Sequence, residues 1–210
     1  MATKLDIFSD PVCPWCYIGK ARLERALEQR PDHPFVIEWH PYMLNPTLPR
    51  EGMDRREYLQ ARFGSPEEVV RLHLPVQQAC DEIGLPLALD KMTRMPSTLD
   101  AHRLVHWAGL EGRQHAVVSA LFRANWAEGR DIGDPATLAR IAGEAGLDSA
   151  MIARLLASDA DVDEIRARDA EIRERGLRGV PGFLIGRRYV LNGAQPVETW
   201  LDLIDKIAAA

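Results

Sequence analysis

The feature that most constrains this chain is a pair of cysteines, Cys13 and Cys16, separated by the dipeptide Pro14-Trp15. Residues 4–8 before the pair alternate as a β-strand does, and residues 19–29 after it carry the apolar spacing of an amphipathic helix. The pair therefore lies at a strand-to-helix junction, where a proline is well tolerated in the first helical turn. Unpaired backbone N–H groups and the positive end of the helix dipole favour a thiolate at this position.

Two thiols one helical turn apart can form and break a disulfide, and we predict Cys13 as the attacking thiol and Cys16 as the resolving one. Lowering a thiol pKa from about 8.5 to about 7 raises the thiolate fraction at pH 7 from ~3% to about half. Nucleophilicity falls with pKa, so the net gain in attack is roughly threefold to fourfold. The alternative is half of a structural zinc site, which needs four ligands. Only Cys80 remains, and it stands alone, so we predict redox chemistry and no metal.

Composition excludes several classes of function. The 210 residues carry a net charge of −5 with Lys and Arg spread throughout, so no basic stripe is available for nucleic acid. No apolar run approaches the ~18 residues that cross a membrane. Residues 1–4 lead directly into the first strand without a secretion signal, which predicts a cytoplasmic protein. Thiols are mostly reduced there, so a cysteine pair is more typical of catalysis than of a structural staple.

The rest of the chain divides into sheet-forming ends and a helical middle. A strand at 35–39 follows the first helix, and near the other end a hairpin of 183–185 and 189–191 precedes a closing helix at 196–208. Between them, the spacing predicts helices over 54–63, 66–83, 98–110, 114–128, 135–145, 148–157 and 161–175. Pro75 should kink or divide the second of these. The pattern predicts an α/β fold in which a helical domain is inserted into one small mixed sheet.

The loop 176–182 contains three glycines and a proline, which is typical of a tightly specified backbone. Pro181 directly precedes a strand, and its bond to Val180 is the candidate for a cis peptide. Only about 5–6% of X–Pro bonds in folded proteins are cis, so the residues alone favour a trans proline that starts an edge strand.

Several segments together resemble the DsbA family of thiol–disulfide oxidoreductases, and in particular its FrnE-like cytoplasmic branch. They are Ser9–Gly19, Asp100–Leu104, Glu128–Ile132 and Gly179–Phe183. The resemblance implies a thioredoxin-like fold (strand–helix–strand plus hairpin–helix), with residues 1–44 and 160–210 in the thioredoxin-like domain and residues 45–159 in a large all-helical insertion. It also implies a cis Pro181 opposite the cysteine pair, with the Val180 backbone available to pair with a substrate chain.

Further candidates for the site surround this motif. Pro14 and Trp15 would shape it, and Trp15 would also offer an aromatic face to a substrate. Gly193, Ala194 and Gln195 precede the last helix, where related glutathione-using enzymes hold the tripeptide, and the alternative is an ordinary loop and helix cap. His40, at the end of the second strand, is a substrate-side candidate.

Other notable residues favour structural roles. Cys80 is expected to be a buried small hydrophobe. His102 and His106 are four apart and could share a metal, but no third ligand is suitably spaced, so packing or surface roles are expected. Met92 and Met95 are expected as core filler or as the lining of a cleft between the domains, and the charged run 161–175 as a solvated helix face.

We therefore expect a dithiol–disulfide oxidoreductase that acts on thiol- or disulfide-containing proteins or on glutathione. It would be a monomer or a homodimer with no bound cofactor, and glutathione would serve as a co-substrate. The first alternative is a glutathione-dependent isomerase or transferase of the 2-hydroxychromene-2-carboxylate isomerase type, which generally carries Ser where this chain has Cys13. The second is a redox-responsive holdase that uses the cleft between the domains.

Overall fold

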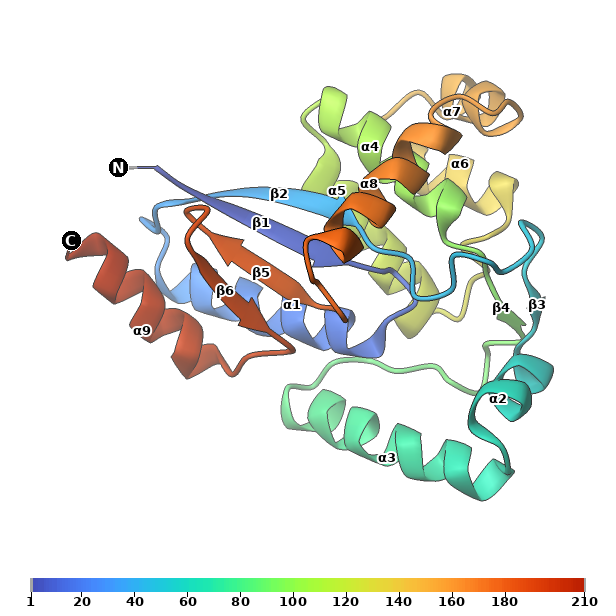
Figure 1. Cartoon of the computed structure of the whole chain (residues 1–210), viewed down its shortest axis with the longest axis horizontal. Coiled ribbons are helices and arrows are strands. Elements are labelled where there is room, and N and C mark those ends of the chain that lie inside the picture. Colours follow the sequence, from blue (N-terminus) through green and yellow to red (C-terminus); the bar gives the residue numbers. More distant parts are fainter. Residues whose placement is uncertain (1, 210) are drawn as a thin grey trace.

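A four-stranded sheet lies at the centre of the structure, a computed structural model that describes residues 2–209 (Figure 1). Its strands are β1 (Thr3–Ser9), β2 (Phe35–Pro41), β5 (Gly182–Ile185) and β6 (Tyr189–Asn192). The spatial order is β2-β1-β5-β6, with β1 parallel to β2 and antiparallel to β5, and β5 antiparallel to β6. A parallel pair needs a crossover, and the first helix provides it.

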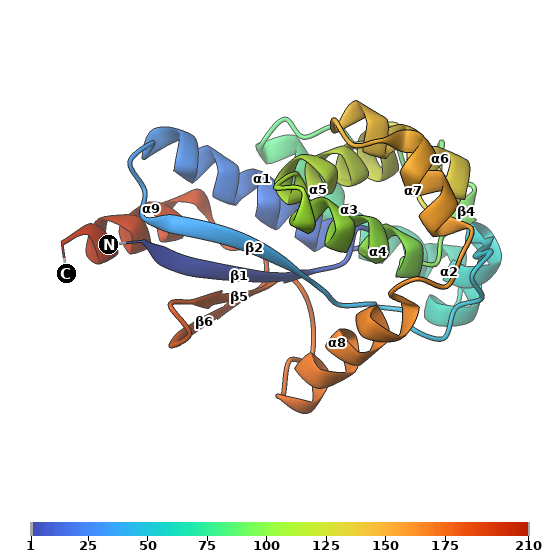
Figure 2. The ribbon, with the colours of Figure 1, turned by 90° about the horizontal axis from the view of Figure 1, so that it is seen from above.

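Two helices cover one face of the sheet, and a third covers part of the other. Helices α1 (Pro14–Gln29) and α9 (Val197–Ala208) lie side by side on the first face, and α8 (Val162–Glu174) lies across one end of the second (Figure 2). The alternation along β1 explains the layering, because the side chains of Leu5 and Ile7 are almost fully buried in the main core. Within residues 2–209, no helix combines the length and apolar character that crossing a membrane requires.

The middle of the chain forms the expected helical block, so the predicted fold class is confirmed. Its helices are α2 (Arg55–Phe63), α3 (Pro66–Glu82), α4 (Leu99–Leu110), α5 (Gln114–Phe122), α6 (Pro135–Glu144) and α7 (Ser149–Leu156). Side-chain caps from Ser65, Asp134 and Asp148 begin three of them. The block is not entirely helical, because the two-residue strands β3 (Met53–Asp54) and β4 (Arg94–Met95) pair within it. The division of the chain at residues 45 and 160 stays a prediction.

Two local expectations are met only in part. Pro75 does not divide its helix, because α3 continues through it, and a kink at this position stays a prediction. Its side chain is exposed, so water can hydrogen-bond the backbone carbonyl that loses its N–H partner there. The predicted helix 114–128 is not uniform either, since α5 passes into a π-helical turn, η1 (Arg123–Ala127).

A fully buried arginine ties the helical block together. The Arg103 guanidinium on α4 donates to the Asp100 carboxylate at 2.6 Å and to the carbonyl of Ala160 at 2.7 Å. It also donates to the carbonyls of Leu155 at 2.8 Å and Ser158 at 2.9 Å. One planar fork thus satisfies the carbonyls at the end of α7 and in the segment leading to α8.

The charged run of α8 is not simply a solvated face, which corrects the expectation. The Asp169 side chain is buried, accepts a hydrogen bond from the Met43 backbone N–H at 2.7 Å, and pairs with Arg173 at 2.8 Å. Arg173 also lies over the Tyr42 ring, with its guanidinium carbon 4.0 Å from the ring centroid. These contacts hold α8 against the segment that follows β2.

The two edges of the sheet differ. At the β2 edge, the Gln114 side-chain amide accepts from the Trp39 backbone N–H at 2.8 Å and donates to its carbonyl at 3.1 Å. This side chain therefore occupies backbone groups that a further strand would use. At the other edge, β6 has no strand beyond it in the described part of the chain, and Tyr189 and Val190 are largely exposed.

Replacing Arg103 tests how much its buried guanidinium contributes to stability. We expect Arg103→Lys to lower the free energy of unfolding by about 2–4 kcal/mol, because an ammonium cannot make all four hydrogen bonds of the buried guanidinium. Urea denaturation measures the change. Arg154→Lys, on the exposed face of α7, is the matched control and should change stability by about 0.5 kcal/mol or less. Equal losses in the two variants would contradict this role.

Candidate active site

Cys13 lies at the start of α1, at its N-cap position, with Pro14 in the first helical turn. Its carbonyl accepts from the N–H groups of Cys16 at 3.1 Å and Tyr17 at 3.2 Å, and its own N–H donates to the Asp10 carbonyl at 2.9 Å. Its thiol makes no capping bond to the helix. The sulfur therefore stands at the positive end of the helix dipole, as the sequence predicts.

The Cys13 thiol faces the loop that precedes β5. The Val180–Pro181 peptide bond is cis, so this prediction is confirmed. The Cys13 Sγ lies 3.6 Å from the Val180 carbonyl oxygen, within the range of a thiol hydrogen bond. This contact joins residues 167 positions apart and places the first turn of α1 opposite the cis-proline loop.

Cys13 and Cys16 are both buried, with 4% and 1% of their surface exposed. Burial raises the pKa of the Cys16 thiol well above its usual value, and the neighbouring Cys13 sulfur raises it further. Favourable contacts with the Ser9 side chain and the Asp10 backbone oppose this shift without reversing it. Both thiols of the pair are free in this structure, as is Cys80. Burial also raises the pKa of Cys80, to about 11, in agreement with its expected role as a small hydrophobe.

Asp10 organises the turn that leads into the motif. Its carboxylate is fully buried and accepts from the Leu44 N–H at 2.7 Å and the Val12 N–H at 3.4 Å. The imidazole of His102 on α4 approaches it, with Nε2 3.7 Å from the Asp10 carboxylate, and this buried nitrogen has no hydrogen-bond partner in the described residues. His102 is thus buried beside the motif, whereas His106 contacts Arg168, so the two histidines do not converge on one metal.

The π-helical turn η1 brings a tryptophan to the motif. Trp126 donates from its indole Nε1 to the Pro11 carbonyl at 2.9 Å and stacks near Tyr17. Nothing in the sequence distinguishes this residue, because its apolar character fits any buried helix face. Asp10 and His102 stand within segments that carried the family resemblance, but their pairing could not be seen from spacing.

Three segments pack against one another near the cysteines: α1, the cis-proline loop and the loop that precedes α9. The Pro181 carbonyl accepts from the Gly193 N–H at 2.8 Å, and the Ala194 carbonyl accepts from Arg22 on α1 at 2.9 Å. Gly19 on α1 fits beneath both segments, since an added Cβ would lie 3.1 Å from the Pro181 ring and 3.4 Å from the Ala194 Cα. Gly193 and Ala194 therefore lie beside the cis-proline loop.

One recess lies beside the motif, and another lies along the cis-proline loop. A pocket of about 210 Å³ is lined by Pro14 and Trp15 on the side of α2 and α3, and Met92 and Met95 line it as well. Trp15 is 38% exposed at its rim. A wider groove of about 740 Å³ runs along the cis-proline loop and includes Val180, Pro181 and Gly193. Gln195 bonds back to its own loop through the carbonyl of Asn192.

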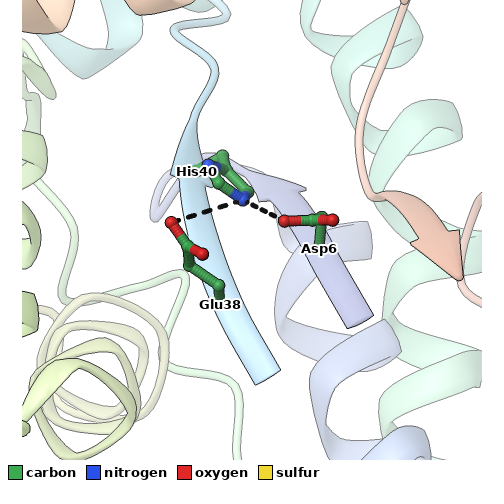
Figure 3. Close-up of side chains that lie close together, drawn as sticks. All are labelled: Asp6, Glu38 and His40. Carbon is green, nitrogen blue, oxygen red and sulfur yellow. Dashed lines mark hydrogen bonds and ion pairs between the residues drawn. The ribbon is translucent and has the colours of Figure 1, made fainter. Parts of the chain in front are cut away.

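His40 lines neither recess, although its ring stacks on Phe8, which lines the groove. It belongs to a charge cluster on the second face of the sheet. Figure 3 shows its ring between two carboxylates, 2.7 Å from Asp6 and 3.8 Å from Glu38. These three side chains could approach one metal ion. The Lys4 ammonium, however, lies 2.8 Å from each carboxylate, and Arg168 donates to the other ring nitrogen of His40 at 3.2 Å.

The charges within this cluster satisfy one another. Burial favours a higher pKa for Asp6, but hydrogen bonds from Lys4 and His40 outweigh it and hold that pKa below its usual value. The same bond to Asp6 raises the pKa of Lys4. Lys4 already pairs with both carboxylates, and Arg168 occupies the other ring nitrogen of His40, so the donor set fits an ion-pair network better than a metal centre.

Comparison with known proteins agrees with this geometry. The model of the DSBA-like thioredoxin domain matches residues 4–205. The chain belongs to the DsbA-like thioredoxin family. This DsbA-family oxidoreductase is similar to a probable DsbA oxidoreductase, SCO1869 from Streptomyces coelicolor, at 32% identity with a TM-score of 0.85, covering 99% of this chain and 90% of that one. The resemblance found in the sequence is thereby confirmed.

Two further relatives extend the comparison. The uncharacterized protein YwbO from Bacillus subtilis is 27% identical to this DsbA-family chain over 92% of each sequence. The cytosolic disulfide reductase DsbM from Pseudomonas aeruginosa, solved with GSH, shares the fold with a TM-score of 0.70, at 22% identity over 99% of this chain and all of that one.

The different settings of the three thiols predict different reactivities. In the reduced protein at pH 8, we expect iodoacetamide to label Cys13, while Cys16 and Cys80 react only as the pH rises toward their raised pKa values. Peptide mass mapping of labelling rates between pH 6 and 11 measures this order. Labelling of Cys16 or Cys80 as fast as Cys13 at pH 8 would contradict it.

The contact between Gly19 and the Pro181 ring predicts how an added methyl group at Gly19 changes stability and disulfide exchange. Alanine normally stabilises a helix by about 0.8–1.0 kcal/mol relative to glycine. In Gly19→Ala, we expect no increase in protein stability, because the added Cβ displaces the Pro181 ring. The same displacement should slow disulfide exchange severalfold. Thermal unfolding and exchange with a model disulfide measure the two effects. Gly179→Ala, in the cis-proline loop with no atom near its Cβ position, is the control for stability and should not lower the unfolding temperature.

Proposed function

We propose that this protein exchanges disulfides with thiol-containing substrates through Cys13 and Cys16. In the reductive direction, the Cys13 thiolate attacks a substrate disulfide, one substrate sulfur leaves as a thiolate, and a mixed disulfide forms. The Cys16 thiolate then attacks Cys13 Sγ, the second substrate sulfur leaves, and the Cys13–Cys16 disulfide remains. The substrate gains two electrons and the pair loses two, while protons pass from the thiols to the leaving sulfurs. The oxidative direction reverses these steps.

The observation that carries this proposal is the position of the Cys13 sulfur between a helix N-terminus and the Val180 carbonyl of the cis-proline loop. The helix end favours the thiolate, both as the attacking group and as a leaving group. An extended substrate chain in the adjoining groove would hydrogen-bond the Val180 backbone as an added strand, which would present its sulfur to Cys13.

The contrast between the two cysteines supports their different roles. Burial raises the pKa of Cys16, which makes it the poorer nucleophile of the free pair and suits it to the second, resolving attack. Trp15, between them, would cover the sulfurs and contact the substrate. Pro14 would set the start of the helix, with no metal or bound cofactor involved.

We further propose that the substrates are cytoplasmic disulfides of proteins or of glutathione, with glutathione as the co-substrate that resets the pair. Support comes from the structural neighbour DsbM, a cytosolic disulfide reductase solved with GSH. In this chain, Gly193 lines the groove along the cis-proline loop and Ala194 follows it, so a peptide backbone such as that of glutathione would lie beside them. Gln195 and His40 are less favoured, because neither lines that groove.

A resolving-cysteine variant tests the proposal. Cys16→Ser should accumulate mixed disulfides through Cys13 after incubation with oxidised glutathione or a disulfide-bonded protein, because the second displacement is lost. Intact-mass measurement detects the adduct, and dithiothreitol should remove it. Cys80→Ser is the matched control and should form no lasting adduct.

An isomerase would keep its turnover in Cys16→Ser, and a holdase would suppress aggregation equally well in Cys13→Ala, so either result would contradict the proposal.

A further inference from the structure

The pocket beside Trp15 has the character of a small-ligand site. Its volume of about 210 Å³ is below the range of about 300–1,000 Å³ that is typical for drug-sized ligands. Most of its lining is apolar, and four lining side chains, those of Trp15, Leu44, Phe63 and Leu72, are each more than a third exposed. Large apolar side chains gathered at one recess on a protein surface are typical of a surface that a ligand covers.

One cation lines this apolar pocket without an anionic partner. Arg55 lies at the start of α2, and its guanidinium has a single side-chain contact in the described residues, with His73 Nε2 at 3.5 Å. Burial lowers the pKa of Arg55, and burial together with the Arg55 charge lowers the pKa of His73. His73 is therefore a neutral acceptor at pH 7, and the positive charge of the guanidinium remains uncompensated.

An uncompensated guanidinium in an apolar recess is energetically unfavourable unless an anion joins it. Two other arginines with buried or half-buried side chains have such partners: Arg173 pairs with Asp169, and Arg103 with Asp100. The planar fork of Arg55 matches a carboxylate, which it can hold through two parallel hydrogen bonds. The uncharged polar groups nearby are already occupied, since the Tyr58 hydroxyl donates to the Asn45 side chain at 2.7 Å.

We propose that this pocket binds a small carboxylate with an apolar aromatic or branched body, with its carboxylate on Arg55 and its body against Trp15. The walls come from the α1 start, α2, α3 and the segment around Met92 and Met95. A ligand placed there lies beside Pro14 and Trp15, at the mouth of the cysteine pair. This site goes beyond the proposed disulfide exchange, because binding requires neither sulfur.

The test compares two ligands of nearly equal shape. Isothermal titration of the full-length protein with 3-phenylpropionate and with uncharged 3-phenylpropan-1-ol should show tighter binding of the carboxylate. Arg55→Gln should weaken 3-phenylpropionate roughly tenfold or more, the usual effect of losing a hydrogen bond between charged groups, and leave the alcohol unchanged. Leu72→Gln should weaken both ligands, because it removes apolar wall from the pocket.

Matched controls separate this site from other effects. Arg56→Gln removes the neighbouring exposed arginine, which does not line the pocket, and should leave both affinities unchanged. Cys13→Ser should bind 3-phenylpropionate as the wild type does, so loss of disulfide exchange and loss of this site can be told apart.

Three results would overturn the proposal: no binding of either ligand, equal binding of both, or a carboxylate preference that survives in Arg55→Gln. Tighter binding of an uncharged, C-terminally capped apolar peptide, unaffected by Arg55→Gln, would assign the pocket to peptides and would overturn it as well. Thermal unfolding of each variant establishes that it is folded before titration.

Discussion

The close approach of α1 to the cis-proline loop is the constraint on which the site depends. A single glycine, Gly19, allows the Pro181 ring and the Ala194 backbone to lie directly on the helix. Through this contact, a loop near the C-terminal end of the chain meets the sulfur of Cys13, at the start of the first helix. The sheet register serves the same purpose, because β1 and β5 are neighbours and deliver the cysteine turn and the proline loop to the same end of the sheet.

Buried polar groups hold the turn before the motif in place. Asp10 uses its carboxylate for the N–H groups of Val12 and Leu44, so the segment that follows β2 is fastened to the cysteine turn. In the same way, the Asp169 carboxylate on α8 accepts a hydrogen bond from the Met43 N–H. Backbone groups in irregular segments need partners as much as those in helices do, and here acidic side chains supply them. The helical block is therefore connected to the active end of the sheet by hydrogen bonds as well as by packing.

The sequence predicts those features that arise from local rules. Caps such as Ser65 and Asp134 give the starts of helices, and the turn at Gly186 and Arg187, both at positive φ, gives the hairpin. The cis bond at Pro181 required a family resemblance, because local energetics favour trans. Contacts between distant segments could not be predicted. Nothing in the spacing of Asp10 and His102 indicates that they meet, a charged run conceals the burial of Asp169, and the missing partner of Arg55 becomes visible only when its neighbours are placed.

The unequal edges of the sheet limit how copies of this protein can join. Gln114 already fills backbone positions at the β2 side, whereas β6 leaves its outer side without a strand. Two molecules that met at β6 would form one continuous eight-stranded layer related by a twofold axis, and each outer end of that layer would be a blocked β2. Gln114 therefore opposes further strand addition at both ends of such a pair, because it occupies the outward backbone groups of Trp39.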